Sequence, residues 1–260
     1  MSEIKEWFLS MPPITRAWFG LSVAFPLIGR LGILNAYYMI LTSDFITKLH
    51  LWRPLSATFY YPLTPGTGFH YLINLYFLYN YSKNLETNEF TGRPADYLFM
   101  LMFNWAALVL MGIFMNLYLL MDPLILSVLY VWCNLNPELI VSFWFGTRFK
   151  ARYLPWVLCG FNLLLGSGGF NEILGIIVGH LYFYVKYKYP QDNGGAQLIN
   201  TPNFLYGYLP SFTPMRSTGS TLNSFQTASS VRNRRNPGPD PAPASSGGYN
   251  WGRGQVLGGR

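Results

Sequence analysis

Six stretches of apolar residues constrain the fold of this chain more than any other feature. Hydrophobic residues make up 51% of the 260 positions and charged residues only 11%, which is about half the charged fraction of a soluble domain. Each stretch is long enough or apolar enough to cross a bilayer or to line a helical bundle. We therefore predict an all-α membrane domain over residues 17–190. The predicted spans are residues 17–34, 66–81, 95–118, 123–133, 153–166 and 172–187.

The distribution of basic residues predicts the orientation of these spans. Residues 1–16 contain charged side chains and no cleavage site after an apolar core, so the first span is expected to act as the insertion signal. An even number of spans places both ends of the chain on one side. Nine Lys and Arg residues near the membrane lie on that side and three on the other, so the positive-inside rule places both termini in the cytosol. The nine are Lys5, Arg16, Lys83, Arg93, Arg148, Lys150, Arg152, Lys186 and Lys188, and the three are Arg30, Lys48 and Arg53.

The loop between the first two spans, residues 35–65, is too polar to cross a membrane and too apolar for a free loop. We expect it to lie in the headgroup region on the side opposite the termini. Trp favours this interface and Arg reaches lipid phosphates, so Trp52 and Arg53 are predicted to anchor the loop. A loop that packs on the protein itself is the alternative.

Residues 191–260 differ in composition from the preceding part of the chain. They are rich in Gly, Ser, Asn, Thr and Pro, and such a segment cannot bury enough apolar area to offset the entropy lost on ordering. We predict a mostly disordered cytosolic tail. Its aromatic segment, residues 204–212, is expected to lie on the membrane surface or to pack below the bundle.

The tail ends in residues 250–259, where Trp251 and Leu257 are separated by glycines. Glycines let a backbone lie flat against the edge of a sheet, while each large side chain fills a pocket. The segment is therefore predicted to be a docking peptide. A disordered end that contains a Trp by chance is the alternative.

Polar residues interrupt several of the apolar stretches. Ionisable groups at membrane depth usually face a bundle interior or water, so the bundle is predicted to have a partly polar interior. Such an interior suits an enzyme site, a substrate groove or a hydrated path. Gly175 and Gly179 form a small-xxx-small pair that lets another helix backbone approach closely. The polar interior is predicted from His70, Asn74, Asn104, Glu172 and His180.

The fifth stretch, residues 153–166, is shorter than the roughly twenty residues that a 30 Å hydrocarbon core requires. Either neighbouring helices shield it or the bilayer thins beside it. Cys133 and Cys159 lie in apolar segments and are interpreted as core residues, which excludes a disulfide framework. The net charge is +7, but the basic residues flank the spans or are scattered along the tail, so we expect no nucleic acid partner. We also expect neither a metal nor a cofactor.

Several blocks within residues 1–210 are too specific to arise by chance. They are WRP at 52–54, ATFY at 57–60, PGTG at 65–68, NLYFLY at 74–79, GRPADYLFM at 92–100, SVLYVW at 127–132, FWFGTRFK at 143–150 and GIIVGH at 175–180. Together they resemble the derlin family, of the first paralogue type, within the rhomboid superfamily. The block from Trp251 to Leu257 is similar to the peptide by which derlins recruit the valosin-containing AAA ATPase.

The resemblance implies a rhomboid-like bundle of six transmembrane helices in the endoplasmic reticulum, without proteolytic activity. It implies retrotranslocation of misfolded lumenal and membrane proteins to the cytosol for ubiquitination and proteasomal degradation. The implied partners are the valosin-containing AAA ATPase, a membrane ubiquitin ligase complex, membrane lipid and further subunits of a homo- or hetero-oligomer. The residues that match the ATPase-binding peptide are Trp251, Gly252, Gly254, Leu257 and Gly258.

The fourth span departs from the pattern of active rhomboids, in which a serine between glycines pairs with a histidine on the sixth span. His180 falls at the histidine position, but Ser127 is flanked by Leu126 and Val128. These side chains fill the room that a nucleophile and a tetrahedral oxyanion require. We therefore expect a non-catalytic protein, with an intramembrane serine protease as the alternative. A small-molecule transporter or ion channel is a third possibility, for which we find no internal repeat.

Overall fold

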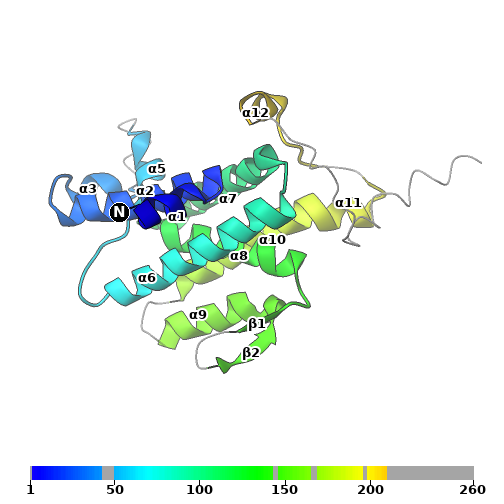
Figure 1. The fold of residues 1–260 in the computed structure, drawn as a ribbon. Coiled ribbons are helices and arrows are strands. Elements are labelled where there is room, and N and C mark those ends of the chain that lie inside the picture. Colours follow the sequence, from blue (N-terminus) through cyan, green and yellow to red (C-terminus); the bar gives the residue numbers. More distant parts are fainter. Residues whose placement is uncertain (1, 43–49, 143–145, 165–168, 196–197, 210–260) are drawn as a thin grey trace, which may run out of the picture. The chain divides into compact units, whose positions relative to one another are not determined.

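The computed structural model describes residues 2–42, 50–142, 146–164, 169–195 and 198–209. Its contacts divide the chain into Met1–Pro214 and Met215–Arg260, and all described residues belong to the first unit. This unit is mostly helical, as predicted (Figure 1). The predicted docking peptide, residues 250–259, lies outside the described residues, as does most of the predicted tail.

Helices and one short hairpin make up the described structure (Figure 1). The N-terminal half contains α1 (Ser2–Leu9), α2 (Pro13–Arg30), α3 (Ala36–Met39), α5 (Trp52–Phe59), α6 (Gly68–Phe77) and the π-helical segments η1 (Leu78–Ser82) and η2 (Leu85–Glu89). The C-terminal half contains α7 (Pro94–Met115), α8 (Met121–Leu135), β1 (Ile140–Ser142), β2 (Arg148–Lys150), the 3₁₀ turn η4 (Ala151–Tyr153), α9 (Leu154–Leu164), α10 (Phe170–Phe183), η5 (Tyr184–Lys188), α11 (Tyr189–Asp192) and α12 (Asn203–Tyr208).

Each of the six predicted stretches contains one of these helices, although the boundaries differ. The largest difference is in the second stretch, where helical structure continues from α6 through η1 and η2 to Glu89. This extension packs on the start of α2. Glu86 accepts hydrogen bonds from the backbone N–H groups of Ile14 (3.0 Å) and Thr15 (2.7 Å). A carboxylate at a helix N-terminus accepts hydrogen bonds from N–H groups that have no partner within the helix, and its negative charge interacts favourably with the helix dipole.

The helices α8 and α10 form the most extensive helix pair in the described part of the chain. A Cβ atom added at Gly175 would lie 2.5 Å from the carbonyl oxygen of Pro123, and one at Gly179 would lie 2.6 Å from that of Ser127. Both distances are shorter than van der Waals contact. Only glycine therefore lets the two backbones approach this closely. The helices α6, α7 and α9 also pack on α8, which is buried along most of its length.

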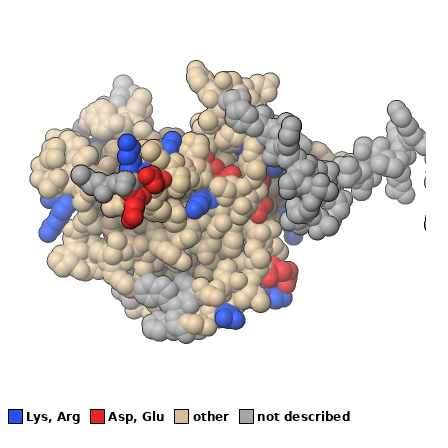
Figure 2. Space-filling view, in the orientation of Figure 1, with Lys and Arg blue, Asp and Glu red and all other residues tan. Residues whose placement is uncertain are grey.

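The outside of the bundle is apolar over large areas. Phe114 on α7 is 84% exposed and Leu164 on α9 is 87% exposed, and Figure 2 shows a face with few charged groups. Apolar exposure of this extent is typical of a membrane-facing or partner-facing surface.

One helix among the described residues, α7, is long and apolar enough to cross a membrane by length and composition. A stretch of 18 residues within this helix has a mean hydropathy of 2.1, and 22% of that stretch is buried. The core helix of a soluble protein would be mostly buried, so this low burial favours contact with lipid. The helix α8 is apolar but shorter. The six-span bundle thus stays a prediction for the other stretches.

The hairpin β1–β2 follows α8 and carries a small ionic cluster at the surface. Val141 pairs with Phe149 in its antiparallel register. Glu138 accepts hydrogen bonds from the side chains of Lys150 (2.6 Å) and Arg152 (2.7 Å). The hydrogen bond and positive charge of Lys150, supported by Arg152, lower the pKa of Glu138 below its ordinary value. This carboxylate is exposed at the surface.

The start of the predicted tail packs on the bundle. Oδ1 of Asp96, in the first turn of α7, accepts hydrogen bonds from the hydroxyls of Thr201 (2.5 Å) and Tyr206 (2.6 Å). Leu205, which lies between Thr201 and Tyr206 in the sequence, is buried. The hydrogen bond to Asp96 raises the pKa of Tyr206. Of the two expectations for residues 204–212, the described part therefore favours packing on the bundle.

Candidate functional site

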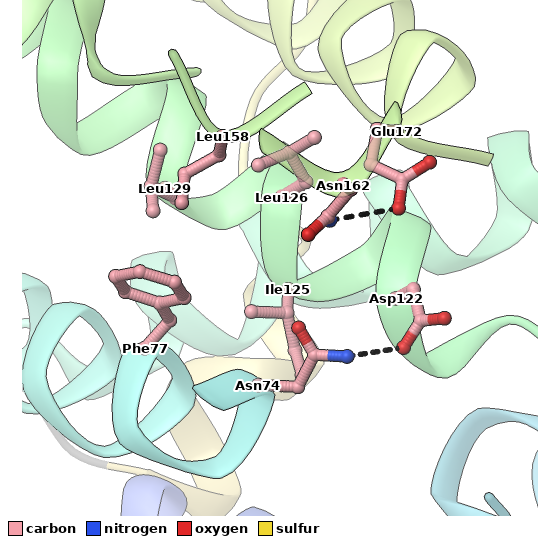
Figure 3. Close-up of a pocket in the computed structure, with 9 residues that line it drawn as sticks. All are labelled: Asn74, Phe77, Asp122, Ile125, Leu126, Leu129, Leu158, Asn162 and Glu172. Atoms are coloured by element: carbon pink, nitrogen blue, oxygen red, sulfur yellow. Dashed lines mark hydrogen bonds between the residues drawn. The ribbon is translucent and has the colours of Figure 1, made fainter. Parts of the chain in front are cut away.

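Four polar side chains meet inside the bundle, one each from α6, α8, α9 and α10 (Figure 3). Nδ2 of Asn74 donates a hydrogen bond to Oδ1 of Asp122 (2.6 Å). Nδ2 of Asn162 donates a hydrogen bond to Oε1 of Glu172 (2.9 Å). We call these four residues the polar cluster. It consists of two amide–carboxylate pairs that line a single cavity.

The cavity within the polar cluster is small. Its volume is about 10 Å³, which is room for about one water molecule. A polypeptide could enter the bundle here only after the helices moved apart. The apolar part of the wall is formed by Phe77, Ile125, Leu126, Leu129 and Leu158.

His70 extends the polar cluster toward the loop before α6. Its Nδ1 lies 2.7 Å from the hydroxyl oxygen of Tyr61 and 3.3 Å from Nδ2 of Asn74. An amide nitrogen can only donate, so Nδ1 of His70 accepts and the ring proton lies on Nε2. The predicted interior residues His70, Asn74 and Glu172 thus lie within one connected region.

His180 was predicted for the same interior, and the structure corrects this prediction. Its side chain is exposed, and Nδ1 lies 2.9 Å from the hydroxyl oxygen of Tyr130. The reason is the helical period: Gly179 faces α8, and the next residue is rotated by about 100° around the helix axis. His180 therefore points away from the polar cluster.

Ser127 has no contact with His180 among the described hydrogen bonds. Its side chain is fully buried, and its hydroxyl donates to the carbonyl oxygen of Leu124 at 2.7 Å. A Cβ atom added at Gly179 would lie 3.1 Å from the Cα of Ser127, so no space for a substrate carbonyl lies between α8 and α10 at this point. The arrangement lacks the hydroxyl–imidazole bond that a serine nucleophile needs.

Asn104, the remaining predicted interior residue, is fully buried on α7. Neither its amide oxygen nor its amide nitrogen has a hydrogen-bond partner among the described residues. It is not part of the cavity wall of the polar cluster. The structure thus places Asn104 inside the bundle but separate from the other interior residues.

The two predicted interface anchors differ in their surroundings. Trp52 is 54% exposed, whereas Arg53 is buried. The guanidinium of Arg53 donates a hydrogen bond to Oγ1 of Thr42 and lies 4.9 Å from the ring centroid of Tyr37. Arg53 thus packs inside the loop, as in the alternative of a locally packed loop, and the anchoring role stays a prediction for Trp52.

A second cavity of about 260 Å³ is lined by Tyr37, Leu41, Thr42, Gly112, Ile113, Asn116 and Tyr118.

Three residues of this region, Tyr61, Asp122 and Asn162, were not predicted from the sequence. Asn162 lies inside a predicted apolar stretch, so the criterion applied to Asn74 could have found it. Asp122 directly precedes the predicted span 123–133, so the sequence indicates a residue at the membrane boundary and not one in the bundle interior. Cys133 and Cys159 are free. No group of three or more His, Cys, Asp or Glu side chains in the described ranges is arranged to hold a metal ion.

The fold and the site define a class of protein: a helical bundle with an apolar exterior that encloses polar side chains between its helices, as in integral membrane proteins. The model of the Der1-like family matches residues 11–203, and the chain belongs to that family. It is 52% identical to Derlin-1 of Bos taurus and to Derlin-1 of Homo sapiens, over 99% of this chain and 99% of each relative. It is 53% identical to Derlin-1 of Caenorhabditis elegans, over 80% of this chain and 85% of that protein. The predicted membership of the derlin family is confirmed, and it agrees with the apolar exterior in implying a membrane protein.

Proposed function

We propose that this chain is a non-catalytic component of endoplasmic-reticulum-associated degradation. It mediates retrotranslocation of misfolded lumenal and membrane proteins to the cytosol. The observation that supports this proposal best is the enclosed polar cluster within an apolar bundle of the Der1-like family. A polar interior lowers the cost of bringing polar polypeptide to membrane depth. Because the cavity is closed in this conformation, transport requires separation of α6 and α9 from the central pair α8–α10.

The proposed location is the endoplasmic reticulum membrane, with several spans and both termini in the cytosol. There the chain works beside a membrane ubiquitin ligase complex and assembles with further copies or other subunits. Its tail recruits the valosin-containing AAA ATPase through residues 250–259, with Trp251 and Leu257 as the two anchors. The ATPase then supplies the force that draws the client out.

The absence of catalysis is part of the proposal, and the interior supports it. Ser127 donates its hydroxyl to a backbone carbonyl, and His180 is exposed beside Tyr130. Neither side chain offers the activated hydroxyl on which acyl transfer depends. The interior therefore serves as a contact surface for the client rather than as a reaction centre.

A complementation experiment tests the proposed function. Cells that lack their own derlin are given this chain, and the decay of a misfolded lumenal glycoprotein is followed by pulse–chase. We expect the wild-type chain to restore the decay. Trp251→Ala and Leu257→Ala are expected to reduce recovery of the ATPase with the chain by about tenfold or more, because each removes a side chain that fills a pocket.

The control for the tail variants is Glu138→Gln, which changes an exposed carboxylate just before the hairpin β1–β2. All three variants should insert into the membrane as the wild type does. Client decay that is equally fast without any derlin would contradict the proposed function. Full recovery of the ATPase with both tail variants would remove residues 250–259 from the mechanism.

A further inference from the structure

An exposed stripe of side chains runs along α10, and it is hydrophobic except at His180. Its members recur every three or four residues, which is the spacing of one face of a helix. His180 is exposed on this face and lies near the middle of the predicted span 172–187. Ionisable side chains at membrane depth usually face a bundle interior or water, so an imidazole on this surface requires a partner. The other members of the stripe are Ile173, Ile177, Leu181 and Tyr184.

The ring of His180 is held in place, but one of its nitrogens has no partner among the described residues. Nδ1 lies 2.9 Å from the hydroxyl oxygen of Tyr130 on α8. The ring of Tyr184 stacks on the imidazole, with the two centroids 6.4 Å apart. No hydrogen bond joins Nε2 to a side chain or backbone group in the described part of the chain. A polar group in an apolar environment costs free energy unless it forms a hydrogen bond, so Nε2 is positioned for a partner from outside.

The chemistry of an imidazole defines what this partner carries. Nε2 donates or accepts, depending on which ring nitrogen holds the proton. An amide or a protonated carboxyl group does both and therefore matches either form of the ring. The hydrocarbon of lipid does neither. Transmembrane helices ordinarily bond such side chains to neighbouring helices, so a subunit that has failed to assemble leaves them exposed to lipid.

A second copy of this chain does not supply such a group at mid-depth. The described residues of the predicted spans expose no carboxylate, and the amide that they expose, Asn116, lies at the C-terminal end of α7. The occupant that matches His180 is therefore a helix of a different membrane protein.

We infer that the stripe around His180 binds a transmembrane helix of an unassembled membrane protein through an amide or carboxyl side chain near the middle of that helix. Tyr130 and Tyr184 orient the imidazole, while Ile177 and Leu181 pack on the apolar part of the client. The inference rests on the proposed function and names one class of client for it.

Photocrosslinking in liposomes tests this surface. The full chain carries a photoreactive amino acid in place of Ile177, three residues before His180, and is reconstituted with a single-span reporter helix of Leu and Ala. Two reporters differ only at the centre of the helix, which is Asn in one and Leu in the other. We expect the Asn reporter to be captured about threefold more than the Leu reporter, because one hydrogen bond between helices in a membrane supplies a preference of this size.

The preference should disappear in His180→Phe, which keeps a ring and removes both nitrogens. It should return in His180→Gln, whose amide both donates and accepts. The same crosslinker in place of Leu110, an exposed residue of α7, should capture the two reporters equally.

Four outcomes would overturn the inference: equal capture at position 177 with His180 intact, a preference that persists in His180→Phe, the same preference at position 110, or capture of a second copy in place of the reporter. The liposomes contain neither ATPase nor ligase. These results are therefore independent of the complementation experiment, and loss of the proposed function is distinguishable from loss of this binding surface.

Discussion

Ser127 and His180 occupy surroundings that differ in depth and in hydrogen bonding. The hydroxyl of Ser127 is buried and donates to the backbone of its own helix, while the ring of His180 is exposed beside Tyr130. A serine becomes a nucleophile only when a base takes its proton and when donors stabilise the oxyanion. Because the ring of His180 contacts Tyr130 and has no described hydrogen bond with Ser127, the hydroxyl of Ser127 has no base beside it.

The first prediction concerns labelling of Ser127. A serine-directed fluorophosphonate should not label the purified chain, because the buried hydroxyl already donates to the carbonyl oxygen of Leu124. The measurement is in-gel fluorescence of the reconstituted protein, with an active rhomboid protease labelled in parallel. Labelling that disappears in Ser127→Ala would contradict the prediction and favour the intramembrane protease.

At this scale the sequence predicts which residues are costly in lipid but not the side of the helix to which each belongs. His70, Asn74 and Glu172 lie in one region as expected. His180 does not, because the glycines before it turn their own face toward α8 and leave it on another. The pairings Asn74–Asp122 and Asn162–Glu172 depend on contacts between different helices, and spacing along one helix contains no information about them.

At the scale of elements, the approach of α10 to α8 depends on two glycines. Our second prediction is that Gly175→Ala and Gly179→Ala each destabilise the protein by about 1–3 kcal/mol, the usual cost of overpacking. The added Cβ would lie 2.5 Å and 2.6 Å, respectively, from backbone oxygens of α8, which cannot rotate away. The measurement is thermal unfolding of the purified protein in nanodiscs.

Gly160→Ala is the matched control for these variants. Gly160 lies within α9, and an added Cβ there meets no atom within 4 Å. Alanine also favours helix over glycine by up to about 1 kcal/mol. The control should therefore be neutral or stabilising. Equal melting temperatures for all three variants would show that the close approach of α8 and α10 contributes nothing to stability.

The contact of α12 with Asp96 leads to the third prediction. Tyr206→Phe removes one of the two hydroxyl donors to this carboxylate. A hydrogen bond to a charged group contributes about 1.5–3 kcal/mol, so local amide protection in residues 198–209 should fall by about tenfold or more. The measurement is hydrogen–deuterium exchange. Tyr208→Phe is the control, because Tyr208 is on the same helix and 85% exposed; the same loss of protection in both variants would contradict the role of Asp96.

The positions of helices could be predicted from the sequence better than their ends. The apolar runs that form α7 and α8 are visible in composition alone. The continuation of α6 to Glu89 is not, since it depends on Glu86 accepting hydrogen bonds from the start of α2. Packing of α12 likewise depends on Asp96, which is about a hundred residues away in the chain. Such ends are decided by long-range polar contacts, which periodicity does not detect.

At the scale of the whole molecule, the short helix α9 has a consequence for the surrounding lipid. It contains 11 residues, which corresponds to about 16 Å at 1.5 Å per residue. The hydrocarbon core of a bilayer is about 30 Å thick. The helix can be accommodated by shielding from its neighbours or by thinning of the bilayer. The exposure of Leu163 and Leu164 at its end favours contact with lipid and hence local thinning.

The last prediction concerns the orientation of the whole chain. The positive-inside rule places residues 35–65 on the lumenal side and both termini in the cytosol. A glycosylation acceptor inserted within residues 35–42 should therefore be modified in cells, whereas one inserted into the tail should not. The acceptor sequence Asn80-Tyr81-Ser82 is predicted to lie on the cytosolic side, so Asn80 should stay unmodified. Its side-chain nitrogen also donates to the carbonyl oxygen of Tyr76 within a helical segment. The measurement is a shift in gel mobility that treatment with a glycosidase reverses. Modification of the tail instead of the loop would contradict the predicted orientation. The inverted topology would place residues 250–259 out of reach of a cytosolic ATPase.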